Sequence, residues 1–150
     1  MDSYQSNIIS LYRNYIQWSK DLMGSFGGVR MLAQLFTGGG EYKNRQEHME
    51  FFSAVEAAAG EYTDAFKAER IDRESLSGLL RYTLIDCHSE SDDWSDWMLM
   101  AAEKHFLPIA GLLTAAEAQE LYEPYRKLRR KNKGLPPQYE MLKLLKARVQ

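Results

Sequence analysis

The sequence predicts an all-α fold, in a single compact and irregular domain spanning residues 1–150. Two observations support this prediction. Apolar residues recur every three or four positions along most of the chain, and alternating β-branched runs typical of strands are absent. The composition, 45% hydrophobic and 27% charged, is that of an ordinary globular protein. We expect about six to eight helices, because short glycine- and proline-bounded segments do not suit a regular bundle.

The first helix is expected from Ser3 to about Met23, where Gly24, Gly27 and Gly28 should end it. Its apolar stripe is unusually broad. A stripe of this width indicates a helix wedged between neighbours or one that exposes an apolar strip to a partner. The stripe consists of Tyr4, Ile8, Ile9, Leu11, Tyr12, Tyr15, Ile16, Trp18 and Leu22.

The next segment, residues 41–70, keeps helical phase throughout. Gly60 costs about 1 kcal/mol relative to alanine within a helix, so one long helix and two shorter ones both remain open. Asp72 is expected to cap the helix that follows, with Ile71 and Leu76 packed as a hydrophobic staple.

A further helix is expected from Asp92 or Asp93 to about Phe106, before Pro108 and Gly111 make the chain irregular. After it, Thr114-Ala-Ala-Glu117 forms a capping box. The helix that this box opens contains Pro124 and should end at Gly134. Pro136-Pro137 then opens the last helix.

Charge is strongly segregated along the chain, although the net charge is only −2. Residues 1–123 contain ten Lys/Arg and twenty Asp/Glu, whereas residues 124–150 contain nine Lys/Arg and a single acid, Glu140. An acidic body and a basic tail can attract each other within one fold or present two faces to different partners.

The sequence also indicates a compartment. Cys87 is the only cysteine, no apolar run approaches the roughly twenty residues of a membrane span, and the N-terminus lacks the pattern of a secretory signal. We therefore expect a cytoplasmic protein that does not enter a membrane.

Two acidic patterns are candidate metal sites. Asp92-Asp93-Trp94-Ser95-Asp96 resembles the DDxxD magnesium and diphosphate motif of terpenoid synthases, although the chain is much shorter than that family's helical bundle. Acids in the first turn of a helix also favour its positive end by about 0.3–1 kcal/mol each, which explains the pattern without a metal.

The second pattern is similar to the paired acidic motifs of all-helical nucleoside triphosphate pyrophosphatases. That resemblance implies that Glu47, Glu50, Glu61 and Asp64 bind magnesium. If all four lie on one helix, however, the two pairs are too far apart to share a cation, and a solvated acidic face is the simpler interpretation.

Other polar groups give no catalytic set. Cys87 is expected in the core, and His48 and His105 each fall on an apolar stripe, where a structural role is favoured. Arg126, Arg129, Arg130 and Lys133 share one helix face that could follow a phosphate backbone or pair with the acidic body. No cofactor is predicted.

Our favoured interpretation is a small cytoplasmic protein-binding module of inhibitory, immunity or regulatory type, which binds a partner with a basic surface. The alternatives are a nucleic-acid-binding protein that uses the basic C-terminal helix and a magnesium-dependent phosphohydrolase, and homo-oligomers remain open. Tryptophan is enriched at protein interfaces, and carboxylates beside it would attract a partner with a basic surface. The predicted recognition residues are Asp92, Asp93, Trp94, Asp96 and Trp97.

Overall fold

Helices make up nearly all of the structure. The computed structural model describes residues 3–37, 39–91, 96–131 and 140–149, and within these ranges it contains eight α-helices, one π-helical segment and no strand. The predicted all-α class is therefore confirmed, and the number of α-helices lies within the predicted range. Side chains are described for residues 3–21, 46–91, 97–130 and 140–149.

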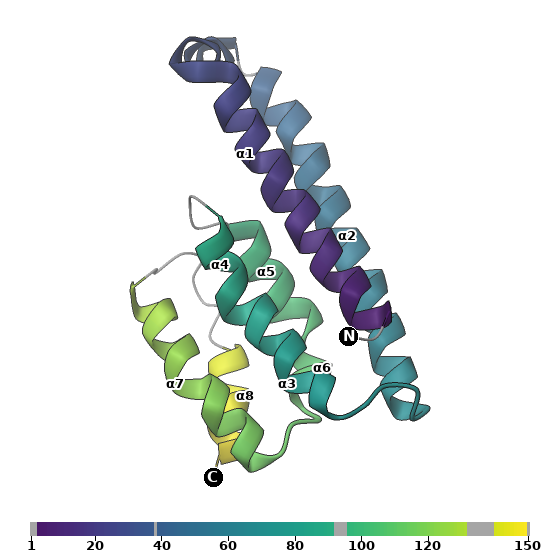
Figure 1. The fold of residues 1–150 in the computed structure, drawn as a ribbon. Helices are drawn as coiled ribbons and strands as arrows, with labels where there is room; N and C mark the ends of the chain where they lie inside the picture. Colours follow the sequence, from purple (N-terminus) through teal and green to yellow (C-terminus); the bar gives the residue numbers. More distant parts are fainter. Residues whose placement is uncertain (1–2, 38, 92–95, 132–139, 150) are drawn as a thin grey trace.

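Two long antiparallel helices, α1 (Ser3–Thr37) and α2 (Gly39–Lys67), form one side of the molecule (Figure 1). The prediction that glycines end the first helix near Met23 is wrong, because α1 continues through all three of them. A glycine costs a helix only about 1 kcal/mol and does not forbid it. Gly60 likewise lies inside a continuous α2, which decides between one long helix and two short ones.

Shorter helices cover the inner side of this pair. The first begins at Glu74, with Arg73 at the N-cap position and no capping side-chain bond, so the prediction that Asp72 caps it is wrong. The backbone opens this helix instead, since the N–H of Ser75 donates to the carbonyl of Asp72 at 3.1 Å. The segments are α3 (Glu74–Arg81), π-helical η1 (Tyr82–Asp86), α4 (Cys87–Glu90), α5 (Asp96–His105) and α6 (Leu107–Ala110).

The last two helices are α7 (Ala115–Lys131) and α8 (Glu140–Val149). The predicted capping box is confirmed: the Glu117 N–H donates to Thr114 Oγ1 at 3.2 Å, and the Thr114 N–H donates to Glu117 Oε1 at 2.8 Å. Pro124 lies inside α7, as predicted. The predicted helix boundaries at Gly134 and at Pro136-Pro137 lie outside the described residues.

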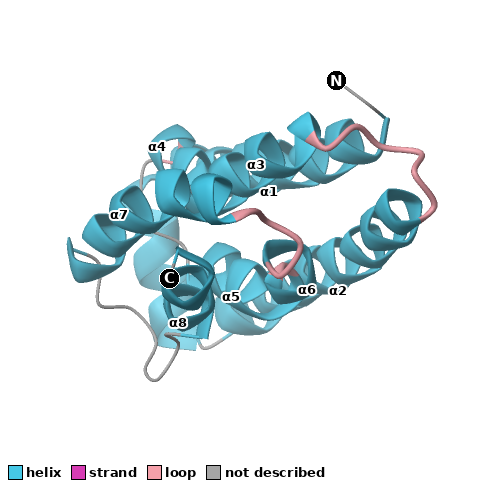
Figure 2. Cartoon of the chain, turned by 90° about the horizontal axis from the view of Figure 1, so that it is seen from below, coloured by secondary structure: helices cyan, strands magenta, loops and turns pink. Residues whose placement is uncertain are grey.

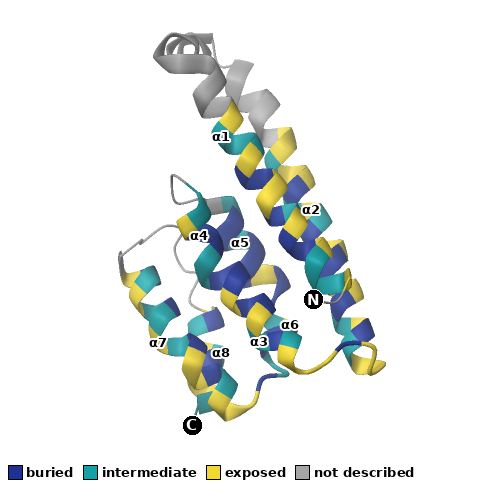
Figure 3. Cartoon of the chain, in the orientation of Figure 1, coloured by how far each residue is buried: buried dark blue, intermediate teal, exposed yellow. Residues whose placement is uncertain are grey.

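A single cluster of buried side chains joins these helices. Fully buried Tyr12 of α1 contacts Phe51 of α2, Tyr82 of η1 and Phe106, with ring centroids 5.1, 6.0 and 6.3 Å apart. Figure 3 shows the buried faces of the helices turned toward one another. The core therefore lies between the α1–α2 pair and the shorter helices.

The arrangement leaves one side of the α1–α2 pair without a neighbouring helix among the described residues. In Figures 1 and 2, the shorter helices all lie on one side of the pair, with α7 and α8 remote from α2. Over the described part of the chain, no helix has the length and hydropathy needed to cross a bilayer. The outward side of α1 and α2 is the surface on which the candidate site lies.

Candidate protein-binding groove

The predicted recognition segment is only partly described. Asp92, Asp93 and Trp94 lie outside the described residues, and Asp96 is the first residue of α5, with its side chain also outside them. Trp97 is described and is half-buried. The residues that contact Trp97 therefore show where the predicted recognition segment packs on the rest of the fold.

Trp97 packs against α2. Its ring is stacked on the imidazole of His48, with centroids 5.3 Å apart and planes 7° from parallel, and its edge meets Phe52 at 6.2 Å. The helix face that follows it lies in the core, because Met98, Ala101 and His105 are buried. Trp97 thus belongs partly to the interior.

His48 connects this tryptophan to α1. Its Nδ1 lies 2.6 Å from Tyr15 Oη, within hydrogen-bonding distance, and its ring meets the edge of Trp18 at 5.4 Å. Burial lowers the pKa of His48. The structural role expected for this histidine is therefore consistent with its surroundings, where it holds two helices and the start of α5 together.

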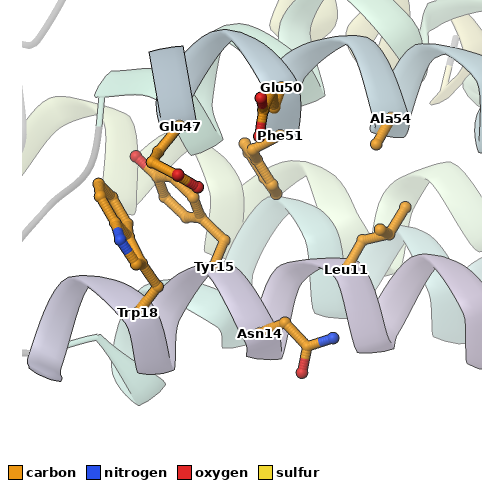
Figure 4. Close-up of a pocket in the computed structure, with 8 residues that line it drawn as sticks. All are labelled: Leu11, Asn14, Tyr15, Trp18, Glu47, Glu50, Phe51 and Ala54. Carbon is orange, nitrogen blue, oxygen red and sulfur yellow. The ribbon is translucent and has the colours of Figure 1, made fainter. Parts of the chain in front are cut away.

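A groove runs between α1 and α2 beside this aromatic cluster (Figure 4). It has a volume of about 270 Å³. Tyr15 and Phe51, whose rings stack with centroids 4.1 Å apart, form its buried floor. Half-buried Leu11 and Trp18 border it on α1. We call this site the α1–α2 groove; its lining residues are Leu11, Asn14, Tyr15, Trp18, Glu47, Glu50, Phe51 and Ala54.

The charge of the groove comes from two exposed carboxylates, Glu47 and Glu50. Glu50 accepts a hydrogen bond from the side-chain amide of Gln46 at 3.2 Å. Neither carboxylate forms an ion pair with a Lys or Arg whose side chain is among those described, residues 3–21, 46–91, 97–130 and 140–149. A ligand of the groove would therefore meet an apolar floor with negative charge along the α2 side.

The magnesium site implied for these acids is not assembled. Glu47, Glu50, Glu61 and Asp64 all lie on the single helix α2, and the two pairs are fourteen residues, or about 21 Å, apart along its axis. Within the described side chains, no group of three or more His, Cys, Asp or Glu could hold a metal ion. The two pairs cannot share a cation.

The basic face predicted on the C-terminal helix is also not formed as expected. Arg129 turns into the core, where its Nε lies 3.6 Å from Glu103 Oε1 and the two side chains are 2% and 1% exposed. Arg126 pairs with Glu123 at 2.9 Å, and Lys133 lies outside the described residues. Arg129 is therefore not available to follow a phosphate backbone.

Glu103 of α5 is a buried carboxylate among three helices. Its carboxylate accepts hydrogen bonds from Tyr125 Oη at 2.6 Å and from the backbone N–H of Met141 at 3.0 Å, in addition to facing Arg129. Burial raises the pKa of Glu103, and these donors act in the opposite direction. The cluster holds α5, α7 and α8 together.

Cys87 lies in the core, as predicted, with no exposed surface. Its thiol donates to the Thr83 carbonyl at 3.3 Å, and burial raises its pKa well above the usual value. Burial, and secondarily the charge of Arg129, lowers the pKa of His88 to about 4. A thiol that is buried and protonated is a poor nucleophile, so these surroundings suit the core position expected for Cys87.

A second groove, about 400 Å³ in volume, lies where α2 faces His105 and Pro108. Its lining mixes carboxylates with Lys104, whose Nζ lies 5.6 Å from the centre of the Phe52 ring. The mixed charge does not select one class of ligand. The α1–α2 groove, apolar with charge of one sign, is the more specific candidate.

No protein-family model matches this chain, and neither a curated protein nor a solved structure is significantly similar to it.

Proposed function

We propose that this protein is a protein-binding module of inhibitory, immunity or regulatory type that holds a partner with a basic surface. The observation that carries the proposal is the α1–α2 groove, where half-buried Leu11 and Trp18 lie beside the exposed carboxylates of Glu47 and Glu50. Interfaces gain most of their energy from a few aromatic or apolar anchors, while charges around them guide and select the partner.

The predicted acidic and aromatic segment belongs to the same proposal. Trp97 and Trp18 both contact His48, so the start of α5 and the groove share one aromatic cluster. Asp92, Asp93, Trp94 and Asp96 remain predicted contact residues. A cytoplasmic location also remains part of the proposal, because the single Cys87 suits a reducing compartment.

The proposal is tested by cross-linking from the groove. A photo-reactive amino acid replaces exposed Asn14, which borders the groove, and a second variant carries it at exposed Glu120 on α7. In living cells, one partner should cross-link to position 14 and not to position 120. Glu47→Lys with Glu50→Lys should abolish that product, because like charges then face the partner's basic surface.

The matched control is Glu56→Lys with Glu120→Lys. It makes the same change in net charge at two exposed positions, and Glu56 lies on α2 about 180° from the groove. Both double variants should fold normally, since exposed substitutions usually change stability by less than about 0.5 kcal/mol. Asp93→Lys with Asp96→Lys, assayed in the same way, separates the segment before α5 from the groove. A product that survives Glu47→Lys with Glu50→Lys rejects the groove.

A further inference from the structure

The α1–α2 groove lies within a longer surface on the outer side of the two helices, which is formed by one row of residues on each helix and which we call the valley. On α1, half-buried Tyr4, Leu11 and Trp18 are spaced seven residues apart, which places them on one helix face. The facing row of α2 alternates steps of three and four residues and is exposed except at half-buried Ala54. That row is Glu47, Glu50, Ala54, Ala57 and Glu61.

The two rows run beside each other because the helices are antiparallel and in contact along their length. Trp18 meets His48 with centroids 5.4 Å apart, and Tyr15 stacks on Phe51 at 4.1 Å. Leu11 and Ala54 border the same groove. The α1 row extends over fourteen residues, or about 21 Å, which corresponds to about four helical turns.

We infer that this valley binds a single amphipathic α-helix of the partner, with apolar residues at seven-residue spacing and Lys or Arg on its flanks; this inference rests on the proposed function. The side chains of Ala54 and Ala57 are small enough for a helix to approach α2 closely. Leu11 and Trp18 supply the apolar contacts, as in other helix-in-groove complexes.

The negative charge of the α2 row favours a partner helix that carries positive charge. The α2 row contributes carboxylates toward both ends of the valley, and neither row contains a Lys or Arg. Glu61 extends the negative charge beyond the groove itself. A basic helix gains from these carboxylates, whereas an acidic helix of the same shape is repelled.

A second copy of this chain is a poorer occupant, because three of its C-terminal arginines are already engaged within the fold. Arg129 pairs with Glu103 inside the core, and Arg126 with Glu123. Arg148 donates through both Nε and Nη2 to the Leu113 carbonyl. The helix that fits the valley therefore comes from a different protein.

Synthetic peptides test this inference on the intact protein. The probe is a labelled peptide of about twenty residues with Leu at seven-residue spacing and Lys on its flanks, matched by a scrambled isomer and by a version with Glu in place of Lys. Fluorescence anisotropy gives the Kd, and circular dichroism shows whether the peptide becomes helical when it binds. Only the phased Lys peptide should bind and gain helix.

Protein variants then locate the binding site. Glu47→Lys with Glu50→Lys should raise the Kd about tenfold or more, and Ala57→Trp should do the same by filling the valley without changing the charge. Glu56→Lys with Glu120→Lys should change the Kd by less than about twofold, because both side chains lie outside the valley.

Three results would overturn the inference. They are failure of the phased Lys peptide to bind, equal binding of the scrambled isomer, and a concentration-dependent dimer abolished by Glu47→Lys with Glu50→Lys in sedimentation. If the peptides fail while the partner still cross-links to position 14 in a Glu50-dependent manner, the partner is not a helix and the proposed function stands. Loss of the cross-link's dependence on Glu47 and Glu50 rejects the proposed function itself.

Discussion

Glu103 is the residue on which three helices depend. Its carboxylate faces buried Arg129 and also accepts hydrogen bonds from Tyr125 and from the first turn of α8. A buried charge is strongly destabilising unless its hydrogen-bond and opposite-charge partners are present. The stability of the C-terminal third of the molecule should therefore respond sharply to this one side chain.

Glu103→Leu should lower the free energy of unfolding by about 3–5 kcal/mol, because it removes the buried carboxylate that faces Arg129 and accepts hydrogen bonds from Tyr125 and Met141. Urea denaturation measures the loss. Replacing Arg129 with Met in the Glu103→Leu variant should recover part of the lost free energy of unfolding, because both positions are then apolar.

The matched control is Glu123→Leu, which removes an exposed carboxylate paired with Arg126. It should hardly move the urea midpoint, because exposed ion pairs contribute little. Equal effects of Glu103→Leu and Glu123→Leu would show that the buried cluster does not hold the helices together.

His88 should make the protein less stable in mild acid. Its pKa falls from 6.5 to about 4 on folding, chiefly because of burial. Between pH 6.5 and pH 4 the unfolded chain therefore binds a proton that the folded chain does not. The free energy of unfolding should decrease through this window by up to about 1.4 kcal/mol for each pH unit lost.

The contribution of His88 is isolated by comparing the wild type with His88→Leu in urea titrations from pH 7 to pH 4.5. The buried Glu103, whose raised pKa has the opposite effect on stability, and the two other histidines are common to both proteins and cancel in the difference. Parallel stability curves for the two proteins would contradict the prediction.

At the scale of helices, glycine had less effect than the sequence suggested. α2 continues through Gly60, and a Cβ built at this position has no atom within 4 Å. The conformational cost of glycine is therefore present, but no contact requires its small size. A single sequence does not show whether a glycine is required by a close contact or is merely tolerated inside a helix. Helix ends were therefore predicted less well than helix faces.

Gly60→Ala should raise the free energy of unfolding by about 1 kcal/mol, because alanine is the stronger helix former and meets no neighbour. Thermal or urea denaturation measures the gain. Gly78→Ala in α3 is the control: its Cβ would lie 3.3 Å from Gln5 Nε2, so its gain should be smaller. A gain at Gly78 that equals or exceeds the gain at Gly60 would contradict this explanation.

For the whole molecule, the periodicity of apolar residues was enough to predict the fold class and most buried faces. It was not enough to show which charged residues turn inward. Arg129 follows Ala118, Tyr122 and Tyr125 at helical spacing, so its buried position was present in the pattern, but its charge led to a surface assignment. The partner that compensates Arg129, Glu103, comes from a distant helix and could not be identified from local spacing.

The sequence predicted only the α1 side of the α1–α2 groove. The broad apolar stripe of α1 indicated either neighbouring helices or an exposed strip, and the structure places Leu11 and Trp18 half-buried beside α2. Glu47 and Glu50 were first considered as metal ligands, because nothing local shows which helix they face. Pairing of α1 with α2 brings the two sets of residues together.

The buried cluster also bears on how the chain can fold during synthesis. Glu103 emerges from the ribosome well before Arg129, Tyr125 and the backbone amide of Met141. Before those groups have been synthesised, burying the α5 face that carries Glu103 would place an ionised carboxylate in the interior without its hydrogen-bond and charge partners, which is costly. The growing chain avoids this cost while that face stays exposed to water. Consequently α5 can reach its final packing only after α7 and the start of α8 have been made.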